Sequence, residues 1–195
     1  MDSTFERVIN VVVAICVYAV LLAVMADFFL YSKRGGERTG RRSTVATASM
    51  LSFVGGYCLV LRAKVGAVQL SRHSVEALVI VGAAIIVAGA AVNIWGRLLL
   101  RDNWANQIRI YADHQLITMG PYALVRHPLY ASIILMLFGG SIIHRNWLAL
   151  LLTMVVFTPA MVYRARQEEV LLEKEVPGYG DYMRRTGMLF PRSRR

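Results

Sequence analysis

The chain has 195 residues, 56% of them hydrophobic, and a formal net charge of +10. The apolar residues come in long blocks that are nearly free of charge, and a chain this short could not bury five such blocks in a water-soluble core. A soluble globular enzyme is therefore excluded. Nucleic-acid binding is also disfavoured, because the basic residues flank the apolar blocks and are not interleaved with exposed aromatic residues.

Five helices are predicted from the apolar blocks, over residues 7–31, 43–61, 75–97, 128–144 and 146–166. Four of the blocks are close to the roughly 20 residues that a helix needs to cross a bilayer. The block 129–144 is shorter, so it is either tilted or part of a hairpin. The first block starts with acidic residues and lacks a small-residue cleavage site, so we expect it to remain as a helix.

Small residues gather on one face of two of these helices. Ala84 and Ala88 lie four apart on the third helix, as do Ser52 and Gly56 on the second. Such faces let membrane helices approach closely. We expect ordinary packing within the bundle, with a dimer interface as the alternative. No Cys/His spacing typical of a metal site is present, so no metal is expected.

The basic residues predict the orientation in the membrane. If five helices cross, seventeen basic residues share one side, in the loop 33–42, the segment 97–127 and the tail from Arg164, against five on the other. The positive-inside rule then places the N-terminus outside, and the long tail with the active site in the cytoplasm.

The polar segments contain shorter elements. The segment 98–127 is too polar to cross, and it is expected to form an amphipathic stretch over 104–110 followed by turns at 112–114 and at Gly120-Pro121. The last apolar helix should continue to Glu175 and stop at Pro177-Gly178, since this pair terminates helices. A short helix over 179–185 and a segment 188–191 that folds back complete the prediction.

Two motifs place ionisable residues at the membrane edge, where such groups are costly and therefore indicate a site. In the motif 120–130, Pro128 suits the first position of a helix, and the free N–H groups of that helix end, beside His127, would attract a carboxylate or phosphate. In the motif 164–169, Arg164 and Glu168 share one helix face. They could hold a zwitterion or pair with each other. Glu169, like Arg166, is offset and expected to be solvated.

These motifs resemble those of the isoprenylcysteine carboxyl methyltransferases. The resemblance rests on Gly-x-Tyr-x-x-x-Arg-His-Pro-x-Tyr (120–130), on Arg-x-x-x-Glu-Glu (164–169), and on Glu-x-x-x-x-x-Tyr-x-x-Tyr (173–182) followed by Arg-Thr-Gly-Met-Leu-Phe-Pro (185–191). It covers residues 103–191. The first motif with a downstream Glu-Glu is shared with phospholipid N-methyltransferases and, more weakly, with membrane sterol reductases.

The resemblance implies an integral membrane enzyme that uses S-adenosylmethionine, held by the segment 97–130 and the tail. By position, the implied cofactor residues are Gln107, His114, Gln115, Leu116, Ile117, Tyr122, His127, Pro128, Leu129, Tyr130 and Glu168. Arg164 matches the arginine that contacts the substrate, and it is the candidate catalytic residue.

Each implied role has a plausible chemistry. Glu168 can accept hydrogen bonds from the ammonium of the cofactor, while His127 and the helix N-terminus can take its carboxylate. Leu116, Ile117, Leu129 and Tyr130 can wall the adenosine, and Gln107 can bond the ribose or adenine. Simpler alternatives remain: His114 as a turn residue, Gln107 on a solvated helix face, and Tyr122 and Tyr130 as interfacial anchors.

The sequence thus predicts one all-α membrane domain over 1–195, with three N-terminal helices in 1–97 and a cofactor-binding half in 98–195. The predicted reaction is methyl transfer to the carboxylate of a lipidic acceptor, such as a C-terminal prenylcysteine, which enters from the bilayer. N-methylation of an aminophospholipid head group is the main alternative. A nicotinamide-dependent reductase is a weaker alternative, because a 2′-phosphate would need a dedicated basic pocket and the related reductases have many more membrane helices. A non-enzymatic adaptor is also weaker, because the motifs of the site are intact.

Overall fold

The computed structural model describes residues 3–31, 37–41, 44–100, 108–111 and 116–192. The long helices are α1 (Ser3–Tyr31), α2 (Thr44–Ala63), α3 (Arg72–Leu100) and α4 (Pro128–Ile143). A fifth helical stretch consists of α5 (Trp147–Leu152), the π-helical segment η3 (Thr153–Phe157) and α6 (Thr158–Glu175). The smaller elements are β1 (Glu37–Arg41), β2 (Ile108–Tyr111), the 3-10 helix η2 (Gly120–Ala123) and α7 (Tyr179–Arg185).

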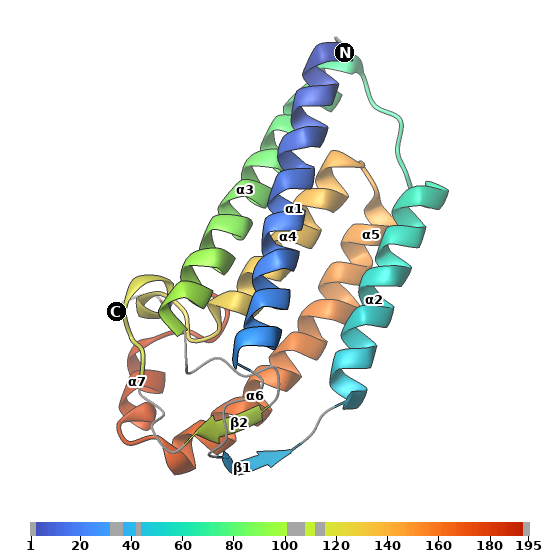
Figure 1. Ribbon diagram of the computed structural model, residues 1–195. Coiled ribbons are helices and arrows are strands. Elements are labelled where there is room, and N and C mark those ends of the chain that lie inside the picture. The colour runs from blue at the N-terminus through green and yellow to red at the C-terminus, as the bar shows by residue number, and fades with distance from the viewer. Residues whose placement is uncertain (1–2, 32–36, 42–43, 101–107, 112–115, 193–195) are drawn as a thin grey trace.

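The long helices form a bundle with its smaller elements at one end. α3 packs mainly against α4, α1 lies along α3, and α2 lies beside α5 and α6 (Figure 1). The two strands and α7 lie at the end of the bundle opposite the N-terminus (Figure 1). In this arrangement the start of α4 and the second half of α6 lie near that same end, where both motifs meet.

Glycines allow the close approach of α3 and α4. A Cβ atom at Gly82 would lie 2.7 Å from the carbonyl oxygen of Gly139, and a Cβ at Gly89 would lie 2.8 Å from Cγ of Met136. Membrane helices gain packing contacts when small residues let their backbones approach in this way. Glycines on both helices therefore let α3 and α4 pack closely against each other.

The predicted small-residue faces are not the ones that the bundle uses. Ala84 and Ala88 are exposed, and a Cβ atom at Gly56 would meet nothing within 4 Å. The glycines of α3 that approach α4, Gly82 and Gly89, lie seven positions apart, and several other small residues share this helix. Spacing within one helix cannot show which of its small faces meets a neighbour.

Three helical segments of the described chain are long and apolar enough to cross a membrane, namely Thr4–Ala26, Arg72–Leu100 and Trp147–Glu175. Ser52–Ala63 and Pro128–Ile143 are apolar but shorter. All five predicted helices are thus present. That all five cross the bilayer, and in which direction, stays a prediction.

The predicted helical architecture is confirmed, and the structure adds one small β-ribbon that the sequence does not predict. β1 and β2 pair antiparallel, whereas the sequence predicts an amphipathic stretch over 104–110 and a loop over 33–42. The sequence of β2 is Ile-Arg-Ile-Tyr, in which apolar and polar residues alternate with the period of a strand. This alternation could have indicated a strand at β2, but β1 (Glu-Arg-Thr-Gly-Arg) has no alternation of apolar and polar residues.

Candidate functional site

The motif 120–130 turns the chain from the polar segment into α4. Gly120 has φ +59, and a Cβ there would lie 2.6 Å from Cδ1 of Leu99, so glycine suits both the backbone and the contact. η2 follows, and α4 then begins with Pro128 directly after His127, whose side chain makes no capping bond. The predicted turn at Gly120 and the predicted start of α4 are confirmed.

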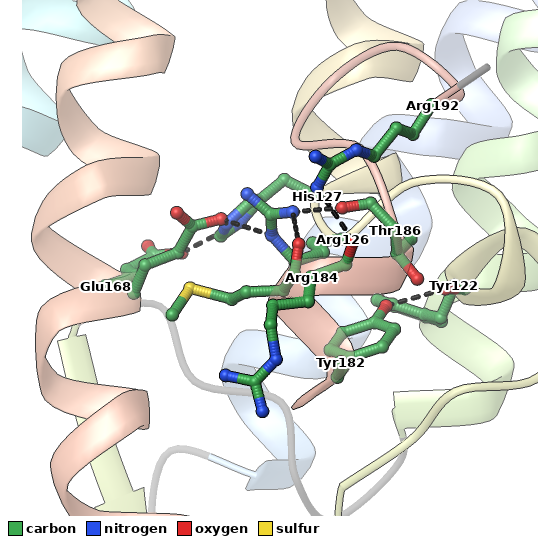
Figure 2. A network of polar contacts seen from close by, with 10 residues as sticks. Tyr122, Arg126, His127, Glu168, Tyr182, Arg184, Thr186 and Arg192 are labelled. Atoms are coloured by element: carbon green, nitrogen blue, oxygen red, sulfur yellow. Dashed lines mark hydrogen bonds and ion pairs between the residues drawn. The ribbon is translucent and has the colours of Figure 1, made fainter. Parts of the chain in front are cut away.

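The tail folds back onto this motif, as predicted. The backbone N–H of Arg126 donates to the carbonyl of Gly187 (2.8 Å), and that of His127 donates to the carbonyl of Met188 (3.0 Å). The Arg126 guanidinium adds bonds to the carbonyls of Met183 (3.0 Å) and Thr186. Figure 2 shows Arg126 between α7 and the start of α4. Arg126 therefore anchors the tail over the start of α4.

Glu169 corrects one of our predictions, because it is buried rather than solvated. Its carboxylate accepts from Nε of Arg126 (2.7 Å) and lies 3.0 Å from Nε2 of His127, and the residue is 8% exposed. Buried charges need such partners. The partners lie directly before α4, more than forty positions away in the chain, so helical spacing within α6 could not reveal them.

Glu168 occupies the neighbouring position and is the more accessible carboxylate. It accepts a hydrogen bond from the Tyr130 hydroxyl, and it lies 3.5 Å from Nδ1 of His127 and 3.6 Å from Nε of Arg164. Its side chain is 21% exposed, against 10% for Glu169. The predicted pairing of Arg164 with Glu168 on one helix face is therefore present, and Glu168 can still reach a ligand.

Tyr130 lies between the charged residues of the two motifs. Its hydroxyl accepts from Nε of Arg164 (2.9 Å) while donating to Glu168. Its ring stacks on the His127 imidazole at 5.6 Å between centroids, and the Arg164 guanidinium carbon lies 5.8 Å from the ring centroid. The Tyr130 ring thereby separates the His127 imidazole from the Arg164 guanidinium.

His127 lies between the two glutamates. Burial works to lower the pKa of its imidazole, but hydrogen bonds and charge attraction from Glu168 and Glu169 outweigh burial and raise it above the ordinary histidine value. The ring therefore stays protonated to a higher pH than a free histidine. In this state it donates hydrogen bonds and is a poor general base.

The other predicted site residues are placed as follows. Tyr122 is buried at α3, where its hydroxyl donates to the carbonyl of Gly96 (3.4 Å), and its own carbonyl accepts from the Tyr182 hydroxyl (2.6 Å). Leu129 also faces α3 at Gly96. Leu116 packs against the buried tail residues Val176, Tyr179 and Tyr182.

The remaining predicted residues divide into two groups. Ile117 is half-buried, and Pro128 is fully buried at the start of α4. Gln107, His114 and Gln115 lie outside the described residues. The structure thus brings Tyr130, His127, Glu168 and Arg164 into one cluster and places Tyr122, Leu129 and Leu116 in the packing around it.

Sequence reasoning missed two buried polar residues on α3. Asn93 is 0% exposed, and its amide donates to Oγ of Ser132 (2.7 Å) while its oxygen accepts from Nε of Arg97 (2.8 Å). Asn93 is the lone amide in the uncharged block 77–96. A polar residue in such a block indicates a specific partner, so this signal could have been used.

Fold and site together define a helical membrane protein with a charged cluster at one end of its bundle. Residues 79–174 match the model of the Isoprenylcysteine carboxyl methyltransferase (ICMT) family. This match covers 96 of the 195 residues and supports the assignment of the chain to this family, in agreement with the resemblance of its motifs.

Two relatives and one solved structure are similar to parts of the chain. The nickel-cobalt-cadmium resistance protein NccN of Alcaligenes xylosoxydans xylosoxydans is 38% identical over 81 residues, 40% of this chain and 37% of that protein. The cobalt-zinc-cadmium resistance protein CzcN of Cupriavidus metallidurans is 34% identical over 82 residues, 41% of this chain and 37% of that protein. The match thus spans little more than a third of each relative.

The solved structure is that of the eukaryotic intramembrane Ras methyltransferase ICMT. It matches with a TM-score of 0.55 and 22% identity, over 77% of this chain and 53% of that one. At this identity the match shows that the two proteins share a fold.

Proposed function

We propose that the protein transfers a methyl group from S-adenosylmethionine to the carboxylate of a lipidic acceptor, such as a C-terminal prenylcysteine, and so forms a methyl ester. The observation that carries the proposal is the placement of Arg164 and Glu168 on one face of α6, 3.6 Å apart and joined through Tyr130. One cation and one accessible anion are thereby held side by side, one for an anionic acceptor and one for a cationic cofactor group.

The residues present fit the cofactor that the family implies. Its methionine part carries an ammonium and a carboxylate. Glu168 offers a partly exposed carboxylate for the first, while protonated His127 and the N-terminus of α4 offer donors for the second. Glu169 is already bound by Arg126 and His127, so we assign it to holding the site together.

The proposed reaction does not require the protein to act as a general acid or base. When bound, S-adenosylmethionine supplies an electrophilic methyl group on a sulfonium. A carboxylate acceptor is already ionised at neutral pH, so it needs no general base. Arg164 would orient it by charge-assisted hydrogen bonds, and the surrounding helices would exclude water. Most of the rate enhancement would come from holding nucleophile and methyl carbon in line.

N-methylation of an aminophospholipid is the alternative, and the charges of the site disfavour it. An amine is protonated at neutral pH, so it would need a base to accept its proton. His127 is a poor candidate because its pKa is raised. Arg164 would repel a cationic head group. An anionic acceptor therefore fits the cluster better.

The proposal includes an orientation, with the N-terminus outside, the tail after Arg164 in the cytoplasm, and the acceptor entering from the bilayer. The seventeen-to-five asymmetry of basic residues supports it. Cysteines introduced at Ser43 and Ser193 should both be labelled from the cytoplasmic side. Labelling of the two positions from opposite sides would refute five crossings.

The experiment that tests the reaction uses detergent-solubilised protein and S-adenosylmethionine with a labelled methyl group. N-acetyl-S-farnesylcysteine and phosphatidylethanolamine are offered side by side, in the presence of a metal chelator. We expect label in a base-labile ester of the prenylcysteine. Base-stable label in the phospholipid would support the alternative, and calorimetry that shows no cofactor binding to folded protein would contradict both.

A further inference from the structure

Arg164 contacts a helix that lies outside the region matching the family. Its Nη1 donates to the thioether sulfur of Met50 on α2 at 3.3 Å, while its Nε is bound to Tyr130. Met50 is half-buried. A thioether is only a weak acceptor, and a guanidinium bonded to a carboxylate gains a shorter, roughly twice stronger bond. A carboxylate that approached Arg164 from this side would therefore displace the sulfur.

The position of Met50 is fixed by residues on the same face of α2. Phe53 and Tyr57 follow at three and seven positions, so the three side chains share one helix face. The Phe53 ring lies 4.7 Å from that of Phe157. The Tyr57 hydroxyl donates to the carbonyl of Leu137 (2.5 Å) and is 3.1 Å from Oγ of Ser141. α2 is thereby held against the fifth helical stretch and α4, and Met50 is held beside Arg164.

We propose that Met50 is a specificity-determining residue of the acceptor site, which limits the bulk of the lipid next to the reacting carboxylate. The inference rests on the proposed function. An acceptor whose carboxylate bonds Nη1 must place its first apolar carbons where the Met50 side chain now lies. Methionine has three rotatable bonds and adapts to its neighbours, so its side chain can pack against the thioether of the acceptor while its volume still limits the space left for a branch on the adjoining carbons.

The test compares two acceptors that differ in branching beside the thioether. N-acetyl-S-farnesylcysteine carries a methyl branch near the sulfur, and N-acetyl-S-hexadecylcysteine is straight. The readout is the ratio of kcat/KM for the branched over the straight acceptor. Because one methylene in an apolar pocket changes selectivity by roughly tenfold or more, Met50→Ala should raise this ratio by about tenfold, and Met50→Phe should lower it by a similar factor.

Two controls separate shape from other effects. Met50→Leu conserves volume and should keep the ratio within about twofold of wild type. Met154→Ala removes the same side chain from an exposed position on η3 (57% exposed) and should leave the ratio unchanged. If Met50→Phe does not fold in detergent, the alanine and leucine variants decide the question.

The outcomes distinguish this inference from the proposed function. If wild type methylates either acceptor but the ratio is the same in the alanine variant and wild type, Met50 does not determine specificity and the proposed function stands. If folded wild type binds S-adenosylmethionine but methylates neither acceptor, the proposed acceptor class is wrong and the role of Met50 falls with it.

Discussion

Glu168 and Glu169 are neighbours in the chain, but the structure predicts that their loss has different consequences. Glu169 is buried, and its Oε1 lies 2.7 Å from Nε of Arg126 and 3.0 Å from Nε2 of His127. Removing one partner of a buried ion pair costs about 3–5 kcal/mol, because it leaves an uncompensated charge. Glu169→Gln keeps an acceptor oxygen, so we expect a loss near the lower end, about 3 kcal/mol.

The matched change Glu168→Gln should cost much less stability. Its charged contacts are longer, at 3.5 and 3.6 Å, and its side chain is more exposed. Contacts longer than a hydrogen bond, with one partly exposed partner, contribute less than a buried hydrogen-bonded pair, and we take about 1 kcal/mol, the upper end for exposed pairs. Glutamine also keeps the oxygen that accepts from Tyr130. The two variants differ in one position along the chain and have the same chemical change, so each is the control for the other.

The assay is thermal unfolding of the purified protein in detergent without cofactor. At this chain length a loss of 1 kcal/mol lowers Tm by roughly 2–4 °C. Glu169→Gln should therefore lower Tm by about 6–12 °C, and Glu168→Gln by about 4 °C or less. Equal shifts, or a larger shift for Glu168→Gln, would show that the buried pairing of Glu169 does not hold the tail and α4 together.

Three further predictions concern binding, pH and packing. Glu168→Ala should weaken S-adenosylmethionine binding by roughly ten- to a hundredfold, because it removes a charge-assisted bond of about 1.5–3 kcal/mol. Arg164→Ala should lower the rate of methyl transfer and leave cofactor binding nearly unchanged. If calorimetry shows that both variants weaken cofactor binding equally, Arg164 and Glu168 form only a structural ion pair. Because the pKa of His127 is raised in the folded protein, its protonated ring stabilises the folded state fully below about pH 6.5. This contribution is lost as the pH rises through the folded-state pKa. The Tm of wild type should therefore fall above that pH, and the Tm of a His127→Gln variant should not show this fall. Gly139→Ala should lower Tm, because its Cβ would lie 2.7 Å from the carbonyl oxygen of Gly82. Gly56 has open space around it, so Gly56→Ala should keep or raise Tm. A lower Tm for Gly56→Ala than for Gly139→Ala would contradict the α3–α4 packing.

The parts of the fold that sequence predicts well are those encoded locally. Uncharged blocks determine where α1 to α4 and the fifth helical stretch lie, and Pro128 and the Pro177-Gly178 pair determine where helices begin and end. The β-ribbon was missed because its two strands are more than sixty positions apart. The polar sequence of β1 does not show which strand it pairs with, because β2 comes next to it only in the folded chain.

The same distinction explains the site. Arg164 and Glu168 are related by one helical turn, so the sequence shows that they share a face. Glu169 lies about 100° further around the helix, and nothing in α6 alone shows what faces it. Its partners come from the residues before α4, which the fold brings to α6. Two adjacent carboxylates on a helix must point in different directions, so a Glu-Glu pair can satisfy one buried cationic anchor and still leave one carboxylate for a ligand. This geometry gives a physical reason for two glutamates at this position where the cofactor ammonium would need only one.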